Sequence, residues 1–377
     1  MAKTLYVGVG GTAKKVKKVY VGVGGTARKV KRGYIGIGGT ARLFYSGGEL
    51  GYYGTVPYPF NARSQLAATT VGNYALFGGG ATSGLSSEVD TVSASLERGV
   101  ATALTESRYQ LAATTVGNLA MFGGGLRAGS ECSSAVDSYD ASLTKKKLTD
   151  LKQEVYGLAA ASVGDHALFI CGVNGTSYTS RVNSYNSSGT FTQRTSLPHG
   201  RAFLAGVSTG HHAVFAGGYN RNSSPYYCNI IDTFDENLTN ITAAATLTTG
   251  RRDLKGALVG EYVIFAGGQC DTGFSSDAEV FSLSMTKYTM LSLTAPRAHL
   301  ASTTIGEYAL FGGGYGAGYF DIVDSFDTSL TRETFTLSEA RSNLAATTVG
   351  DYALFGGGSG NFSSSYYTGT VDAFVFS

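Results

Sequence analysis

The chain has 377 residues, of which 43% are hydrophobic and 15% charged, which excludes a disordered chain and allows a large buried core. Its 53 Gly and 5 Pro favour many tight turns between short strands over long helices. No apolar run approaches the roughly 20 residues that span a membrane. No secretory signal is expected at the N-terminus, and the four cysteines form neither a disulfide framework nor a zinc motif.

Charge divides the chain into two parts. Residues 1–48 hold ten Lys or Arg and no acidic residue, whereas residues 49–377 hold the other 19 basic side chains and all 27 acidic ones. Because the two parts differ so strongly in charge, we expect two modules. The first is a basic N-terminal segment over residues 1–48, and the second is a domain over residues 49–377.

The basic segment contains three copies of one pattern, spaced by 14 residues. Residues 6–13, 20–27 and 34–41 each read Tyr-Val/Ile-Gly-Val/Ile-Gly-Gly-Thr-Ala, and clusters of Lys and Arg separate them. The copies are β-prone, and so short a β segment is marginal alone. We therefore expect an anchoring strand array that other copies of the chain or a partner protein complete. Its candidate anchoring residues are Tyr6, Tyr20, Tyr34, Lys14, Lys15, Arg28 and Lys29.

Two other functions of this segment stay open. The Gly-x-Gly-Gly strings are similar to phosphate-binding loops, but no helix signal follows them. Ten uncompensated charges would also attract phosphates of a nucleic acid at low salt, although the regular pattern differs from a loose basic tail.

The repeated Tyr-Val/Ile-Gly-Val/Ile-Gly-Gly-Thr-Ala string resembles N-terminal anchoring repeats on tail-associated proteins of bacteriophages and prophages. That resemblance implies docking into a virion.

A second repeat fills residues 63–377. The string Leu66-Ala-Ala-Thr-Thr-Val-Gly-Asn-Tyr-Ala-Leu-Phe-Gly-Gly-Gly80 recurs almost unchanged twice and in degraded form four times, with its Leu also at Leu111, Leu158, Leu204, Leu254, Leu300 and Leu344. Each copy predicts four short antiparallel strands, and such units at this spacing form the blades of a β-propeller. The predicted blades are about 63–107, 108–154, 155–200, 201–250, 251–296, 297–340 and 341–377.

The Gly doublet after an aromatic-rich strand resembles the kelch repeat, although the chain has no Trp. The resemblance implies an all-β, seven-bladed, kelch-like propeller. The last copy stops at its third strand, and residues 50–60 stand ahead of the first copy where the others have a fourth strand. We therefore expect residues 50–60 to close the last blade, with Pro57 and Pro59 on its exposed edge.

An arginine stands three residues before the Leu in six of the seven copies, and Val155 replaces it in the third. The six are Arg63, Arg108, Arg201, Arg251, Arg297 and Arg341. They predict a ring around one mouth of the channel, a type of position that contacts ligand in kelch domains that bind acidic peptides. The alternative is structural, because Asp90, Asp137, Asp232, Asp324 and Asp372 begin third strands at the same end of the blades. Arg–Asp pairs would then tie adjacent blades together.

Loops rich in Tyr, Ser, Gly and Asn follow the Gly triplets on the same face. This composition is typical of recognition surfaces, since Tyr gives rigid contact area and the small polar residues give adaptable hydrogen bonds. Surface glycans are the ligand class that we expect, because aromatic faces suit sugar rings. The candidate residues are Tyr219, Tyr226, Tyr227, Tyr315, Tyr319, Tyr366 and Tyr367.

Catalysis finds little support in the sequence. The five His fall at different repeat positions, and no nucleophile, zinc-protease or paired-carboxylate motif stands out, so we expect neither metal nor cofactor.

We expect a non-enzymatic virion structural or host-adhesion protein, oligomeric within the particle. Residues 1–48 would bind other virion proteins and the propeller a host surface glycan or protein. The alternatives are a cytosolic kelch protein-interaction module and, third, a kelch-type carbohydrate enzyme.

Overall fold

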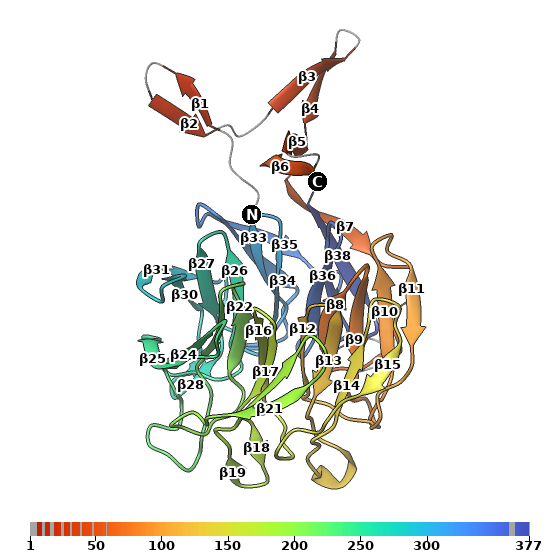
Figure 1. The fold of residues 1–377 in the computed structure, drawn as a ribbon, viewed down its shortest axis with the longest axis vertical. Helices are drawn as coiled ribbons and strands as arrows, with labels where there is room; N and C mark the ends of the chain where they lie inside the picture. Colours follow the sequence, from red (N-terminus) through yellow and green to blue (C-terminus); the bar gives the residue numbers. More distant parts are fainter. Residues whose placement is uncertain are drawn as a thin grey trace.

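The computed structural model describes residues 49–57, 59–361 and 366–376 with their side chains, and of residues 1–48 the course of six strands. These strands are β1 (Tyr6–Val9), β2 (Thr12–Lys15), β3 (Val19–Val23), β4 (Thr26–Val30), β5 (Arg32–Ile37) and β6 (Thr40–Ser46). They pair as three antiparallel hairpins, one from each copy of the 14-residue repeat (Figure 1).

The hairpins place the first two repeats in the same register. Tyr6 stands opposite Lys15, and Tyr20 stands opposite Lys29. Lys14 and Arg28 lie in the same returning strands, and Tyr34 lies in β5. The expectation of β structure is therefore confirmed for this segment. The anchoring role that we predicted depends on side chains that lie outside the described residues.

Seven four-stranded antiparallel sheets follow, and each is a blade (Figure 1). From inner to outer strand, blade 1 has β8 (Ala67–Val71), β9 (Tyr74–Gly78), β10 (Val89–Ser93) and β11 (Arg98–Ala101). Blade 2 has β12 (Ala112–Val116), β13 (Leu119–Gly123), β14 (Val136–Tyr139) and β15 (Lys145–Lys147). Blade 3 has β16 (Ala159–Val163), β17 (His166–Ile170), β20 (Val182–Asn186) and β21 (Phe191–Arg194). Blade 4 has β22 (Ala205–Ser208), β23 (His212–Ala216), β24 (Ile230–Asp235) and β25 (Asn240–Thr246), and blade 5 has β26 (Lys255–Val259), β27 (Tyr262–Ala266), β30 (Asp277–Ser282) and β31 (Lys287–Ser292). Blade 6 has β32 (Ala301–Ile305), β33 (Tyr308–Gly312), β34 (Ile322–Asp327) and β35 (Arg332–Thr336), and blade 7 has β36 (Ala345–Val349), β37 (Tyr352–Gly356), β38 (Val371–Phe376) and β7 (Leu50–Thr55).

The inner strands form a closed ring. Each inner strand packs beside that of the next blade, and β36 packs against β8 again. The predicted all-β propeller with seven four-stranded blades is therefore confirmed. Within the described residues, helix is limited to one 3₁₀ turn at Ala128–Ser130, and no helix there is long and apolar enough to cross a membrane.

The last blade is closed by the N-terminal strand, as predicted. β7 pairs with β38, with Leu50 opposite Phe376 and Thr55 opposite Asp372. The strand is shorter than expected, and Pro57 and Pro59 lie beyond its end rather than on its edge. Beyond the strand, the amides of Val56 and Phe60 donate to carbonyls of the last blade at 2.8 Å each, which keeps the chain attached without a continuous ladder.

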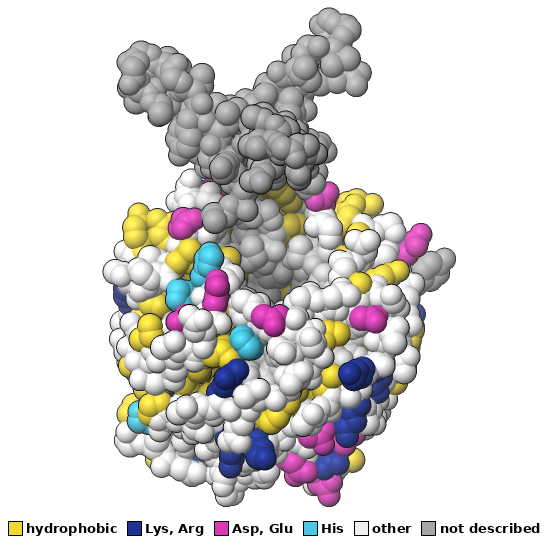
Figure 2. Space-filling model, viewed as in Figure 1, with side chains coloured by type: hydrophobic (Ala, Val, Ile, Leu, Met, Phe, Trp, Pro, Cys, Tyr) yellow, Lys and Arg dark blue, Asp and Glu magenta, His cyan; other side chains and the backbone are white. Residues whose placement is uncertain are grey.

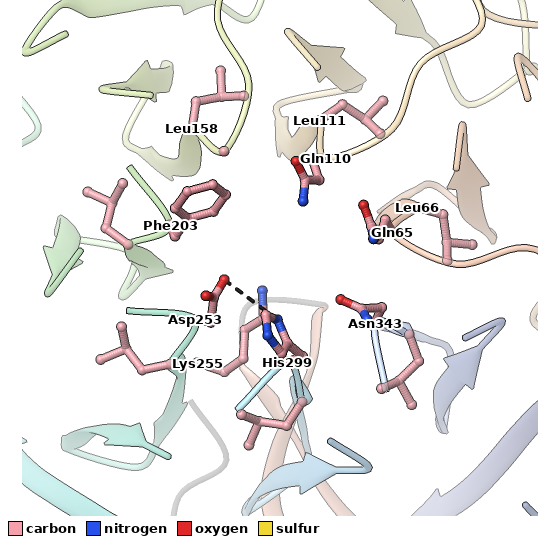
Figure 3. A pocket seen from close by; sticks show the side chains of 15 residues that line it. Gln65, Leu66, Gln110, Leu111, Leu158, Phe203, Asp253, Lys255, His299 and Asn343 are labelled. Atoms are coloured by element: carbon pink, nitrogen blue, oxygen red, sulfur yellow. Dashed lines mark ion pairs between the residues drawn. The ribbon is translucent and has the colours of Figure 1, made fainter. Parts of the chain in front are cut away.

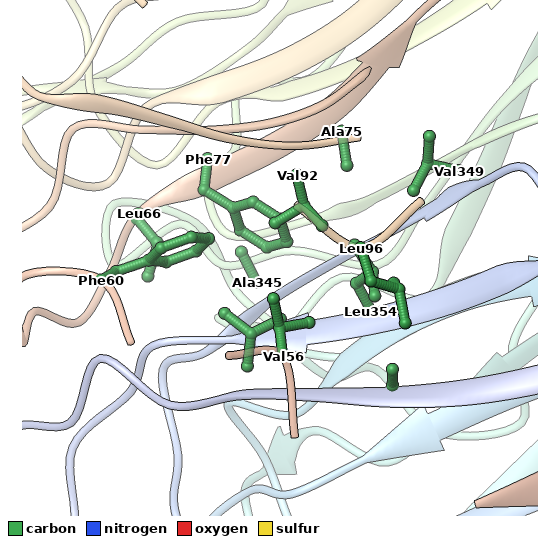
Figure 4. Close-up of a cluster of buried hydrophobic side chains, with 12 residues drawn as sticks. Val56, Phe60, Leu66, Ala75, Phe77, Val92, Leu96, Ala345, Val349 and Leu354 are labelled. Atoms are coloured by element: carbon green, nitrogen blue, oxygen red, sulfur yellow. The ribbon is translucent and has the colours of Figure 1, made fainter. Parts of the chain in front are cut away.

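Phenylalanine rings fill the spaces between blades and explain the first glycine of the triplet. A Cβ on Gly78 would lie 2.8 Å from the ring of Phe122 in the next blade, and one on Gly356 would lie 2.9 Å from the ring of Phe77. Figure 4 shows Phe77 among buried side chains of blades 1 and 7, including Phe60. Burying such a ring stabilises the fold by about 1.5–3 kcal/mol, so the glycine leaves room for it.

Candidate ligand-binding face

The six repeat arginines lie inside the blades. Each is at most 1% exposed. Each pairs with an acid on the third strand of its own blade at 2.6 to 2.9 Å: Arg63–Asp90, Arg108–Asp137, Arg201–Asp232, Arg251–Glu279, Arg297–Asp324 and Arg341–Asp372. The prediction that these arginines ring the channel mouth for a ligand is wrong, because protein encloses every guanidinium. The pairing alternative names the right partners except Glu279, but its expectation that the pairs tie adjacent blades together is wrong, because each pair lies within one blade.

In blades 2, 5, 6 and 7 the same acids also hold the linker that enters the blade. In blade 6 the guanidinium of Arg297 donates to the carbonyl of Phe311 at 3.2 Å and to Asp324 at 2.8 Å. Thr294, in the linker from blade 5, donates its amide to Asp324 at 3.1 Å and its hydroxyl at 2.5 Å. Thr or Ser donates to the acid in the same way at Thr105, Thr248 and Ser338. Each pair therefore lies within one blade, and in these four blades its acid also fixes the linker from the previous blade.

Blade 3 shows what the pair does, because it lacks both charges. Val155 stands in place of the arginine, and Asn183 stands in place of the acid. Asn183 accepts from the amide of Lys152 at 3.0 Å and donates to the carbonyl of Phe169 at 3.3 Å. One neutral amide thus makes both kinds of contact. Since arginine and acid are replaced together, the pair acts as a structural unit.

The acid in blade 5 is held in its ionised form. Burial alone would raise the pKa of Glu279, but hydrogen bonds from Lys287 and Thr248 and the charge of Arg251 outweigh it and keep that pKa below the usual value. Burial likewise lowers the pKa of Arg297, and Asp324 opposes that shift. The buried pairs are therefore arranged to keep each other charged.

A ring of seven residues lies at the channel mouth, one per blade, each immediately before a repeat Leu. In each, the backbone amide donates to the carbonyl of the equivalent residue one blade earlier, at 2.7 to 3.3 Å, and the circuit closes from Gln65 to Asn343. The mouth ring consists of Gln65, Gln110, Gly157, Phe203, Asp253, His299 and Asn343. A continuous belt of backbone hydrogen bonds therefore joins all seven blades.

Every residue of the mouth ring has a left-handed backbone, with φ between 52° and 63°. Glycine takes this conformation without cost, as Gly157 does, whereas another residue pays of order 1 kcal/mol. Six blades nevertheless carry a side chain there. Strain of this kind concentrates at functional sites, so the side chains of the mouth ring are candidates for ligand contact.

The mouth-ring side chains converge on a cavity of about 150 Å³ at the channel mouth (Figure 3). Asp253 and His299 form an ion pair at 3.7 Å, too long for a good hydrogen bond. The buried Oε1 of Gln65 has no hydrogen-bond partner. A buried acceptor without a partner is costly, and a ligand that donates to it would remove that cost.

The mouth ring was not among the residues predicted from the sequence. Its members stand directly before the repeat Leu. The Leu is constant in all seven blades, whereas the residue before it is Gln, Gln, Gly, Phe, Asp, His and Asn in turn. A position that varies in chemistry inside a constant repeat has no motif to reveal it.

Short hairpins surround the mouth ring. In each blade the residue after the Gly doublet bridges the residue just before the mouth-ring position, for example Tyr219 with Ala202 and Tyr315 with Ala298. The predicted Tyr-rich loops therefore lie on the same face as the channel mouth. We call these hairpins, at 81–85, 126–132, 173–178, 219–227, 269–274 and 315–319, together with the bridged residues Ser359 and Tyr367, the hairpin face.

Aromatic rings connect neighbouring hairpins on this face. Tyr178 contacts Tyr219 at 6.1 Å between ring centroids, and Tyr219 also packs on Tyr227 and under the guanidinium of Arg252. A second chain of contacts runs through Phe274, Tyr315, Tyr319, Tyr366 and Tyr367. The aromatic set spans blades 3 to 7, and the hairpins of blades 1 and 2 have no aromatic residue.

Three of the predicted tyrosines present much of their surface to solvent. Tyr226 is 51% exposed, Tyr315 39% and Tyr366 53%. The hydroxyls of Tyr319 and Tyr366 are hydrogen-bonded to each other, and burial together with that bond raises the pKa of Tyr319 to about 12. Beside Tyr226 lies a groove of about 470 Å³, also lined by Asn220 and Ser223. The rings are thus fixed and partly open, next to polar side chains.

Charge on the propeller is mixed. On the side shown in Figure 2, acidic and basic side chains lie near one another and no field of one sign covers the surface. Within the described residues, no three His, Cys, Asp or Glu side chains are grouped so as to hold a metal ion.

Comparison with known proteins supports the fold. No protein-family model matches the chain, and no curated protein matches it. Among solved structures it is similar to that of YjhT, with a TM-score of 0.58 and 14% identity over 74% of this chain and 98% of that one. So low an identity shows the propeller fold alone. The kelch type and the likeness to phage anchoring repeats stay predictions from the sequence.

Proposed function

We propose that the protein is a non-enzymatic binding protein whose hairpin face recognises a glycan. The observation that carries this proposal is the set of half-exposed, mutually packed tyrosines around the channel mouth. A sugar offers one apolar C–H face and a rim of hydroxyls, and a tyrosine offers a flat ring with a polar tip. Because ring–ring contacts already fix these side chains, little conformational entropy is lost on binding.

The groove beside Tyr226 adds the polar half of such a site. Asn220 and Ser223 line it, and amide and hydroxyl groups can both donate to and accept from sugar hydroxyls. The mouth ring supplies further amides at Gln65, Gln110 and Asn343. Uncharged groups of this kind suit a neutral oligosaccharide.

We propose further that residues 1–48 dock the chain into a larger assembly, a phage or prophage virion, with the propeller displayed for contact with the host. Three hairpins in one repeated register, carrying ten basic and no acidic residues, support this role. Two-stranded hairpins are marginal on their own and are stabilised by pairing with other strands. The virion as location is supported by the resemblance of the 14-residue repeat.

A glycan array with the full-length protein tests the binding proposal. Binding of one glycan class should fall about tenfold, or ~1.4 kcal/mol, for Tyr226→Ala or Tyr366→Ala. Tyr288→Ala is the matched control, because Tyr288 is 61% exposed but lies on the outer strand β31. Equal binding by all three variants, or no glycan bound at all, would refute glycan recognition by this face.

A catalytic role is the second candidate, and the pairing of Asp253 with His299 at the channel mouth is the observation that favours it. A carboxylate and an imidazole in one cavity are the parts of a general acid–base pair. Turnover of any glycan bound on the array, lost in His299→Gln but kept in Tyr366→Ala, would favour the enzyme over the binding protein.

A further inference from the structure

Lys255 interrupts the pattern of the inner strands. The first residue of the inner strand is alanine in the other six blades, at Ala67, Ala112, Ala159, Ala205, Ala301 and Ala345. In blade 5 it is Lys255. Figure 3 shows its side chain extending into the channel just behind Asp253 and His299. Blade 5 thus places an amine in the channel at a position where the other six blades have alanine.

The channel behind the mouth ring is a cavity of about 250 Å³, which we call the throat. Ala, Gly, Ser and Leu residues line it from the blades, and Lys255 is the one charged residue among those lining it that the structure describes. Lys255 also borders the mouth cavity, so its amine stands between the two. The throat has room for a small organic molecule or about eight waters, at about 30 Å³ each.

The amine of Lys255 has no counter-ion in contact. Its Nζ makes no hydrogen bond or ion pair with any residue that the structure describes. The nearest acid at the mouth is Asp253, which already pairs with Arg252 at 3.5 Å and with His299 at 3.7 Å. The surrounding protein lowers the pKa of Lys255, and Asp253 opposes that shift. The Lys255 side chain is exposed to the solvent of the channel, so its positive charge can attract an anion that enters there.

We propose that the throat is a binding site of its own, which holds a small organic monocarboxylate against the ammonium group of Lys255. One cation balances one negative charge, whereas a phosphate dianion would bring a second charge for which the described lining of the throat offers no cation. The carboxylate end of the ligand would face Lys255, and its uncharged part would lie along the Ala and Gly residues of the throat. This site is separate from the glycan-binding tyrosines of the hairpin face.

Saturation-transfer NMR with the full-length protein tests this site. The probes are acetate and propionate, with acetamide as the neutral molecule of the same shape and inorganic phosphate as the dianion. Lys255→Ala is unusually safe for folding, because alanine occupies the same position in six blades. Lys146→Ala on the exposed outer strand β15 is the control for loss of one positive charge.

Acetate and propionate should bind the wild-type chain and Lys146→Ala alike, and at least tenfold more weakly to Lys255→Ala. Acetamide and phosphate should not compete. Undiminished acetate binding by Lys255→Ala, no acetate binding by the wild type, or preference for phosphate would each overturn the proposal. Tyr366→Ala should leave acetate binding unchanged, so failure of the glycan site and failure of the throat site give different results.

Discussion

At the scale of single residues, the charged arginine–acid pairs of six blades can be compared with the uncharged pair of blade 3. Arg297→Val alone would leave Asp324 as a buried carboxylate without its guanidinium, and breaking a buried pair costs about 3–5 kcal/mol. Adding Asp324→Asn copies the Val155 and Asn183 combination of blade 3, so most of that loss should be recovered. Urea unfolding, with the midpoint shifted and the slope m unchanged, measures both values. Equal losses in the single and double variants would contradict a self-contained pair.

The same residues show where sequence reasoning stops. Arg and Asp at fixed repeat positions were enough to predict the pairing, because opposite charges at one end of each blade attract. They could not predict that both groups are buried, since burial depends on how the linkers fold over them. Glu279 was missed because its blade uses the longer acid. The mouth ring was missed because backbone conformation, and not residue type, is what its members share.

At the scale of elements, the closing strand β7 depends on a hydrogen bond that responds to pH. The hydroxyl of Tyr52 donates to Asp372 at 2.7 Å, and Asp372 also pairs with Arg341. Partial burial, followed by the bond and charge of Asp372, raises the pKa of Tyr52 from 10.0 to about 12. Because the folded-state pKa is raised, the bond stabilises the folded chain fully below pH 10, and this stabilisation is lost as the pH rises towards 12.

Tyr52→Phe should therefore cost about 1 kcal/mol at neutral pH, a modest loss because Tyr52 is 43% exposed. The difference in unfolding free energy between wild type and variant should shrink between pH 10 and 12. Guanidinium unfolding at a series of alkaline pH values gives this difference directly. A gap that stays constant across that range would show that the hydroxyl does not stabilise the strand through Asp372.

The elements themselves were largely predictable. Leu, Gly and Phe at constant offsets identified seven blades, because each blade must bury the same ring against the next. The closing strand followed from counting, since the last repeat had three strands and residues 50–60 had none to pair with. The residue at which this strand ends could not be predicted. The amides of Val56 and Phe60 bond to carbonyls of the last blade, and the fold of that blade decides where those carbonyls lie.

At the scale of the whole molecule, the ring closure and the basic segment are adjacent in sequence but should be separable in function. Removing residues 1–48 leaves Leu50, which is 8% exposed against blade 6 and 7 residues, and the whole of β7 in place. That variant should unfold within about 1 kcal/mol of the full-length chain, since the inter-blade core is untouched. It should lose any higher assembly seen for the full chain in analytical ultracentrifugation.

Removing residues 1–60 takes away β7 as well, together with the buried side chains of Leu50, Val56 and Phe60. At about 1.5–3 kcal/mol for each large apolar side chain, the loss should exceed 4 kcal/mol, and an unpaired β38 edge should promote aggregation. Equal stability of the two truncated chains would mean that ring closure adds nothing. An assembly that survives removal of residues 1–48 would instead place the contacts between copies on the propeller, because the hairpins would no longer be there to make them.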